Sequence, residues 1–186
     1  MNEDFIIDNL LKPKKKKKIN SNKKGKRKEL QVVAALNKRF EEMLSKFPSW
    51  GQFSRTVASG ARWGQNVVLP QHAKDTFTGD LVCPSGGFKY VIESKGGYNE
   101  IDLCSVFNGK CSQLDGFLSQ VQKDAERCGR KPLLLWKKDR KPMLSVVKYE
   151  DVKNYEFKIY MKYNDWIILE FDDFFKLPDN FFFKNA

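Results

Sequence analysis

Two acidic residues and a lysine occur in an order that could support metal-dependent hydrolysis. They are Asp80 and the members of the triplet Glu93-Ser94-Lys95. Side chains two residues apart on a β-strand project from the same face, so Glu93 and Lys95 would lie side by side at the end of a strand. Two carboxylates beside one lysine would form a pocket of hard oxygen ligands with charges of both signs.

The chemistry that this set could perform is hydrolysis of a phosphodiester. Mg²⁺ prefers a few carboxylates with water and phosphate oxygens, so Asp80 and Glu93 are predicted ligands, with the backbone carbonyl of Ser94 as a further oxygen. Mn²⁺ would be a suitable substitute. A bound cation would activate water, and Lys95 could orient that water or stabilise developing negative charge. An exposed strand face with a Glu–Lys salt bridge would show the same Glu-x-Lys spacing. The triplet therefore indicates an active site only together with the elements around it.

A hairpin is predicted to bring the two acids together. Residues 80–83 (DLVC) and 88–95 (FKYVIESK) have the β-branched and aromatic composition of strands. Between them, Pro84-Ser85-Gly86-Gly87 is a strong turn signal. Pairing across this hairpin would place the Asp80 carboxylate close to Glu93.

Helices are predicted on either side of this hairpin. Apolar residues at helical spacing predict one helix from residue 28 to about 47, ended by Pro48, and another over 114–128, closed by Gly129. Residues 96–111 show no regular pattern. Strands are expected at 52–58, 132–137 and 142–148, with one or two more between 155 and 171.

The excess positive charge lies in one short stretch. The net charge is +11, and residues 11–28 hold eleven Lys or Arg and no acid, whereas the other 23 basic residues equal the 23 acidic ones. We predict a disordered basic arm over residues 1–27 that binds nucleic-acid backbones by counterion release. A solubilising tail or a nuclear-import signal is the alternative. The basic residues predicted to contact nucleic acid are Lys14, Lys15, Lys16, Lys17, Lys18, Lys24, Lys26 and Arg27.

Length and composition indicate one globular domain with a tail. The chain has 186 residues, of which 41% are hydrophobic and 15 are phenylalanine. We expect a core over 28–150 and a β-rich extension over 151–186, whose aromatic residues favour packing over stacking on bases. The absence of a long apolar run or a secretory signal predicts no membrane association and a cytoplasmic protein, in the host cytoplasm or nucleoid if it is viral. Four cysteines without a Cys-x-x-Cys pair do not favour a zinc site.

The acidic motif resembles that of a known nuclease superfamily. Asp80 with Glu93-Ser94-Lys95 is similar to the PD-(D/E)xK motif, with Gly79 where the motif's name places proline. The stretch Gly25-Lys26-Arg27-Lys28-Glu29, Arg55, and Ser59-Gly60 look like the archaeal-type Holliday-junction resolvases and their phage relatives. The resemblance covers about residues 25–148.

That resemblance implies a fold and a set of roles. The implied fold is an α/β, restriction-endonuclease-like αβββαβ core with a mixed central sheet flanked by helices, which assembles as a homodimer and leaves a 5′-phosphate on cleavage. Glu29 would be a helix-borne catalytic acid near the metal, acting through water, beside the ligands Asp80 and Glu93 and the catalytic Lys95. The residues implied to contact the DNA strand are Arg55, Ser59, Gly60 and, on the helix after the core sheet, Gln120.

The function expected from these features is resolution of Holliday junctions in DNA recombination, repair or replication. Cutting two symmetric strands needs two related active sites, which a two-fold dimer supplies. A flap, single-strand or recombination nuclease with the same site is one alternative, and a non-catalytic nucleic-acid-binding protein that uses the basic arm is another. His72 and Asp75 precede Asp80 and could act as a base or an extra acid, although solvated loop residues are more common.

Overall fold

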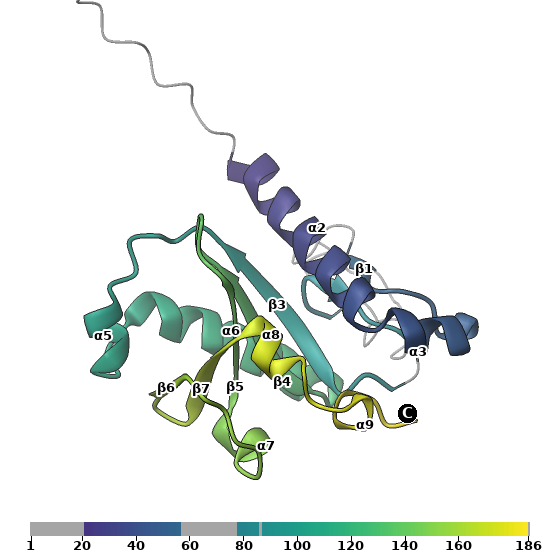
Figure 1. Ribbon diagram of the computed structural model, residues 1–186. Helices are drawn as coiled ribbons and strands as arrows, with labels where there is room; N and C mark the ends of the chain where they lie inside the picture. Colours follow the sequence, from purple (N-terminus) through teal and green to yellow (C-terminus); the bar gives the residue numbers. More distant parts are fainter. Residues whose placement is uncertain (1–20, 57–77, 86, 186) are drawn as a thin grey trace, which may run out of the picture.

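A five-stranded mixed sheet forms the centre of the protein, which is described here from a computed structural model covering residues 21–56, 78–85 and 87–185 (Figure 1). The strand order is β3-β4-β5-β7-β6. The strands are β3 (Tyr90–Gly96), β4 (Lys131–Lys137), β5 (Met143–Lys148), β6 (Tyr160–Tyr163) and β7 (Trp166–Glu170). The β3–β4 pair is parallel and the other pairs are antiparallel, so β3 is an edge strand with a parallel neighbour.

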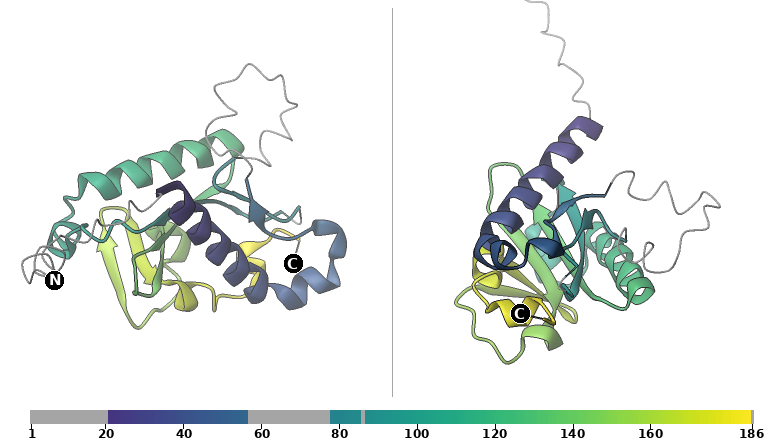
Figure 2. Two further views of the ribbon diagram at one scale, coloured as in Figure 1. Left: turned by 90° about the horizontal axis from the view of Figure 1, so that it is seen from above. Right: turned by 90° about the vertical axis from the view of Figure 1, so that its right-hand side faces the viewer.

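Helices cover both faces of this sheet, as the implied fold requires. Figure 2 shows α2 (Ser21–Arg39) on one face and α6 (Ser112–Cys128) on the other. Successive side chains of β3 alternate between the faces, so Tyr90 and Ile92 join the hydrophobic cluster under α2, whereas Val91 joins the cluster under α6. The following odd-numbered residue of β3, Glu93, therefore faces α6.

The long helix α6 makes the crossover that the parallel pair β3–β4 needs. Its predicted apolar stripe is buried, and it ends at Gly129, whose φ of 65° is the left-handed conformation that glycine adopts most easily. The short helix α5 (Leu103–Phe107) lies in the stretch predicted to be irregular, and it begins where Asp102 accepts hydrogen bonds from the N–H groups of Cys104 and Ser105. None of the helices in the described part of the chain has an apolar stretch of the length that a bilayer crossing requires.

The first helix begins earlier than predicted and is interrupted. Residues 21–27, which the charge pattern assigns to the disordered arm, form the first turns of α2. The single helix predicted over 28–47 is two, because α2 ends at Arg39 and α3 (Glu41–Lys46) follows, with a 3₁₀ turn, η1 (Pro48–Trp50), after it. The break occurs at Phe40, whose backbone leaves the helical region with φ −104° and ψ 16°.

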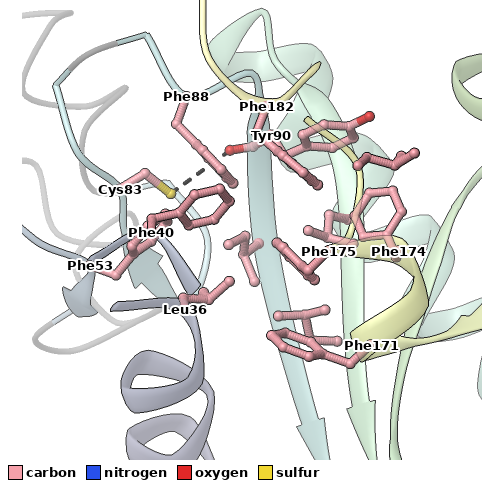
Figure 3. Packing of buried hydrophobic residues seen from close by; sticks show 14 of the residues in the cluster. Leu36, Phe40, Phe53, Cys83, Phe88, Tyr90, Phe171, Phe174, Phe175 and Phe182 are labelled. Carbon is pink, nitrogen blue, oxygen red and sulfur yellow. Dashed lines mark hydrogen bonds between the residues drawn. The ribbon is translucent and has the colours of Figure 1, made fainter. Parts of the chain in front are cut away.

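Phe40 lies at the centre of an aromatic core that includes residues far away in the sequence (Figure 3). Its ring contacts five others, with centroids between 5.2 and 6.2 Å away: Phe53, Phe88, Phe175, Phe182 and Phe183. The pair with Phe53 is stacked and the other four are edge-to-face, and such pairs add to the stabilisation from buried apolar surface. The aromatic residues near the C-terminal end of the sequence therefore include several that pack in the core, as predicted.

Part of the region predicted as a β-rich extension over 151–186 belongs to the central sheet. Strands β6 and β7 continue the sheet beyond β5, and three short helices accompany them: α7 (Tyr149–Val152), α8 (Phe171–Phe174) and α9 (Asp179–Phe182). After α9 the chain pairs with the segment before β3, through the bridge between Phe88 and Phe183 and a 2.8 Å hydrogen bond from the N–H of Lys89 to the Phe182 carbonyl. This pairing holds the start of β3.

The predicted hairpin does not form as one ladder. In the described residues, β1 (Ser54–Arg55) and β2 (Leu81–Val82) pair with each other in a separate antiparallel sheet. The segment before β3 is already paired with residues 182–184, and beside β3 itself the described residues of β2 form no ladder. There the N–H of Asp80 donates to the carbonyl of Ile92 at 3.0 Å. The segments that carry Asp80 and Glu93 are thus adjacent, as expected, but they are joined by individual hydrogen bonds and not by a continuous strand ladder.

Candidate active site

Three hydrogen bonds hold Asp80 in place, and two of them are to the outer edge of β3. Its N–H donates to the Ile92 carbonyl at 3.0 Å, and its carbonyl accepts from the N–H of Thr56 at 3.0 Å. The carboxylate Oδ2 accepts from the N–H of Ser94 at 2.9 Å. Because Ile92 and Ser94 are two residues apart on one strand, their backbone groups face the same edge, and both face Asp80.

Gly79 fits its position because no side chain could. Its φ is 84°, and a Cβ there would lie 2.8 Å from both the Ile92 carbonyl oxygen and the Val91 Cγ2 atom. Proline requires a φ near −65° and therefore could not adopt this conformation. The departure from the motif's proline at this position thus has a local cause: the chain reaches Asp80 through a backbone conformation that favours glycine.

Replacing Gly79 with alanine should displace Asp80 and slow any reaction at this site. Misplacing a reacting group by about 1 Å can cost roughly a hundredfold in rate, and the left-handed conformation adds about 1–2 kcal/mol of strain for alanine. Single-turnover cleavage rates and thermal unfolding of the Gly79→Ala variant would test this. A matched control is Gly116→Ala, since Gly116 has open space around it and an ordinary φ. Wild-type cleavage by the Gly79→Ala variant would contradict the expectation.

Glu93 and Lys95 lie on the same face of β3, as their spacing predicts. Glu93 is only 2% exposed, and its Oε1 atom is 2.5 Å from the Lys95 ammonium nitrogen. That nitrogen also donates to Gln120 Oε1 at 3.0 Å, and it lies 5.4 Å from the centre of the Phe117 ring. The structure therefore places Gln120 at the site, and α6 contacts the lysine through two residues.

Asp124 is an acidic neighbour of this group that the sequence analysis did not identify. It lies one helical turn beyond Gln120 on α6, and its side chain is 17% exposed and paired with Arg127 at 3.2 Å. It is near enough to Glu93 for its charge to contribute to raising the pKa of that carboxyl. Side chains four apart share a helix face, so the spacing from Gln120 was the available signal.

Burial and charge set the protonation of the central groups. Burial, together with the charge of Asp80, raises the pKa of Glu93 to about 7. Burial also raises the pKa of Asp80, against the opposing effects of the Ser94 N–H and of Lys95. Burial alone would lower the pKa of Lys95, but Glu93 and Asp80 outweigh it, and the pKa of Lys95 lies above its usual value. Lys95 is therefore a cation at neutral pH.

The two carboxylates suit a divalent cation that keeps several of its waters. Within the part of the chain that the structure describes, no group of three or more acidic, histidine or cysteine side chains could hold a metal ion. Asp80 and Glu93 are nevertheless within hydrogen-bonding reach of each other, and the charge of Asp80 raises the pKa of Glu93. A divalent cation relieves such repulsion, and Mg²⁺ commonly uses only one or two protein carboxylates. The donor set therefore fits the predicted metal.

The raised pKa of Glu93 predicts a pH-dependent stability of the metal-free protein. Because the folded-state pKa is about 7 against 4.5 for an ordinary glutamate, the protonated form favours folding. The contribution of Glu93 is therefore present below about pH 4.5 and lost as the pH rises through about 7. Relative to Glu93→Gln, wild-type protein in EDTA should lose on the order of 1–3 kcal/mol between these limits. Thermal unfolding of both proteins across this range measures the difference, and parallel curves would contradict the assignment.

Glu29 and Arg55 form an ion pair beside Asp80. The Glu29 carboxylate on α2 accepts a hydrogen bond from the Arg55 guanidinium on β1, and both side chains are partly buried. Glu29 is close enough to Asp80 for its charge to contribute to raising the pKa of Asp80. Glu29, the residue predicted to act near the metal, thus lies close to Asp80, but its direct partner is Arg55, the arginine predicted to meet phosphate.

The remaining predicted residues fall into two groups. Ser59, Gly60, His72, Asp75 and residues 14–18 lie outside the described residues. Lys24, Lys26 and Arg27 lie on the first turns of α2, where Lys26 and Arg27 are exposed. The contact of the Ser94 carbonyl with a metal stays a prediction.

The chain is similar to one family of known proteins over most of its length. A family model described as "Phage putative PDDEXK endonuclease" matches residues 20–184. The match includes Asp80, the Glu93-Ser94-Lys95 triplet and both helices that flank them. No curated protein and no solved structure matches the chain significantly.

Proposed function

The chain belongs to the phage PDDEXK endonuclease family, and from this premise we propose that it hydrolyses DNA phosphodiesters with Mg²⁺ at Asp80, Glu93 and Lys95. Membership places it among the PD-(D/E)xK nucleases. The observation that carries the proposal is the juxtaposition of a buried carboxylate, Glu93, and a partly buried one, Asp80, with the cationic Lys95 at the edge of β3. Such an arrangement costs stability and is typical of a site built for chemistry.

Each of these side chains has a role that follows from its contacts. Lys95 is protonated and held by Glu93 and Gln120, so it donates to an oxygen of the scissile phosphate and stabilises the charge that develops there. Its raised pKa argues against a role as general base. Asp80 is oriented by the Ser94 N–H, and its carboxylate lies within hydrogen-bonding reach of Glu93, with which it would share a ligand.

A divalent cation would be held by Asp80 and Glu93. When bound, it supplies Lewis-acid stabilisation of the phosphoryl oxygens and lowers the pKa of the attacking water. We propose Mg²⁺ as the natural ion, with Mn²⁺ as a substitute, because both accept hard oxygen ligands. Glu29 would contribute through its partner Arg55, which meets the phosphate of the bound strand.

For the substrate, we propose branched DNA, with the four-way junction as the preferred form and a homodimer as the active species. The support is the similarity of residues 25–29 and of Arg55 to junction resolvases, together with the basic stretch that joins α2. Two related active sites in a dimer would match the two symmetric cuts. A flap, single-strand or recombination nuclease would use the same catalytic residues, so substrate shape must be measured directly.

The proposal is tested by cleavage of four-way junction, flap, linear duplex and single-stranded DNA with Mg²⁺, Mn²⁺ or EDTA. We expect cutting that requires the metal and that is fastest on the junction, with paired cuts and a dimeric mass in solution. Equal rates on all four substrates would remove the junction preference and leave the nuclease. Metal-independent cutting, or none on any substrate, would overturn the proposed function. Removal of residues 1–20 should weaken DNA binding and its salt dependence while cutting persists.

A further inference from the structure

We infer that the turn between β4 and β5, residues 137–141, binds the phosphate backbone of the DNA beside the active site. This inference rests on the proposed function and deepens it, because it names a surface that would hold the substrate. The turn reads Lys137-Lys138-Asp139-Arg140-Lys141, with four basic residues and one acid. A run of separate positive charges, without an enclosed pocket, suits a polyanionic backbone.

The turn lies at the end of β3 that carries the catalytic residues. In the parallel register, Lys95 is opposite Trp136 and Gly96 is opposite Lys137. The N–H of Gly97 donates to the Lys137 carbonyl at 2.9 Å, so the start of the turn is joined to the chain just after the active-site strand. Figure 1 shows the β4–β5 turn beside this end of β3. A DNA strand bound by the turn would therefore pass close to Lys95.

The one acid in the turn is occupied by structural contacts. Asp139 Oδ1 lies 3.2 Å from the Lys28 ammonium, and Oδ2 accepts from the Asn99 side chain at 2.9 Å. The N–H of Asp139 donates in turn to the Asn99 side-chain oxygen at 2.9 Å. These bonds fix the shape of the turn and leave its basic side chains without an acidic partner inside it.

The basic side chains of the turn keep their charges free for a ligand. The Lys137 and Lys138 ammonium groups donate to the carbonyls of Lys141 and Ile101, which are neutral acceptors. Arg140 and Lys141 are exposed and form no ion pair within the described residues. Arg140 also has a φ of 57°, a conformation that glycine adopts more readily. The turn thus presents a guanidinium at a position where the backbone alone would favour glycine.

The first turns of α2 place further positive charge beside the same end of β3. Lys28 packs against Gly96, where an added Cβ would lie 2.5 Å from the Lys28 Cγ atom, so this part of the helix is fixed against the end of β3. Lys26 and Arg27 precede it and are exposed. The β4–β5 turn and the start of α2 therefore form two basic elements joined by the Lys28–Asp139 ion pair. Together they would hold phosphates next to the site.

The test compares DNA binding of Arg140→Gly/Lys141→Gln with that of wild type in EDTA, so that no cutting occurs. Fluorescence anisotropy with a duplex and a four-way junction over a salt series gives the affinity and its salt slope. We expect the affinity of the variant to fall about tenfold at low salt and the slope to decrease by about 2, because two phosphate contacts are lost. The melting temperature should change little, because glycine relieves the positive φ of Arg140 but also gives the unfolded chain more conformational freedom.

The matched control is Lys153→Gln/Lys158→Gln, which removes the same charge beyond α7, at the other end of β5. If the turn variant binds with the slope and affinity of this control while wild type still cuts, the inference is wrong and the proposed function stands. If wild type neither binds nor cuts DNA, the proposed function fails and the inference with it. If the double variant melts at a lower temperature than wild type, the binding measurement is repeated with Lys141→Gln alone. A salt slope equal to that of wild type would then overturn the inference.

Discussion

Glu93→Gln and Asp80→Asn should each reduce DNA cleavage by about a thousandfold or more, because metal-ion stabilisation contributes several kcal/mol to such reactions. Each substitution keeps the shape of the side chain and removes a carboxylate from the pair at the edge of β3. Asparagine at position 80 could still accept the hydrogen bond from the Ser94 N–H, so the backbone position should be preserved. Single-turnover cleavage in Mg²⁺ measures the loss.

A second measurement separates loss of chemistry from loss of folding. Calorimetric titration with Mn²⁺ should show weakened ion binding in both variants, while thermal unfolding in EDTA should show folded proteins, with Glu93→Gln at least as stable as wild type near neutral pH. The matched control is Glu150→Gln, which changes a largely exposed acid next to β5 and should cut normally. Cleavage at the wild-type rate by either active-site variant would remove that residue from the site.

Lys95→Met should reduce the cleavage rate by about 10²- to 10³-fold, the usual cost of losing one preorganised donor to a developing charge. Methionine keeps the unbranched stem over the Phe117 ring but cannot donate to a phosphate oxygen. Because both metal ligands remain and a competing positive charge beside them is lost, Mn²⁺ should bind at least as tightly as to wild type, and the folded variant should still bind DNA in EDTA. Lys158→Met is the control for loss of an exposed lysine.

The stability of the Lys95→Met variant should depend on the metal more strongly than that of wild type. Without the ammonium, Glu93 and Asp80 lose the only basic group that the structure places against both of them among the described residues. Their mutual repulsion at neutral pH would then be relieved by a divalent ion, so the rise in melting temperature on adding Mn²⁺ should exceed that of wild type. A variant that cuts as fast as wild type would assign Lys95 a structural role only.

Those parts of the fold that depend on local pattern could be predicted from the sequence. The apolar stripe of α6, its end at Gly129, and the apolar runs of β4 and β5 appear close to their expected bounds. In each case the apolar residues that set the sequence pattern are also the residues that are buried, so the pattern reflects the packing. The shared face of Glu93 and Lys95 was predictable for the same reason.

What the local pattern did not predict depends on partners distant in the sequence. The break at Phe40 serves a ring cluster that includes Phe182 and Phe183, and no window around residue 40 contains those partners. The pairing of residues 87–89 with 182–184 likewise replaced part of the expected hairpin. Which segments pair depends on how several segments compete for the same strand edge, and the strand propensity of one segment gives no information about its competitors.

The candidate site likewise combines residues that local sequence predicts with contacts that only the fold reveals. Asp80, Glu93 and Lys95 could be named from type and spacing, because hard-oxygen ligands next to a lysine suggest one kind of chemistry. The pairing of Glu29 with Arg55, in contrast, joins α2 to β1 and required the arrangement in space. The steric need for Gly79 arises from the Ile92 carbonyl and the Val91 side chain, which belong to another segment.

The two hydrophobic clusters on opposite faces of the sheet give the site two separate mechanical supports. Packing under α2 determines where Glu29 sits, whereas packing under α6 determines where Gln120 and Phe117 hold Lys95. A conservative volume change under α2 would therefore act first on Glu29, and one under α6 would act first on Lys95 and Gln120. Because β3 contributes Tyr90 and Ile92 to one cluster and Val91 to the other, it is the strand through which a change in either core would reach the rest of the site.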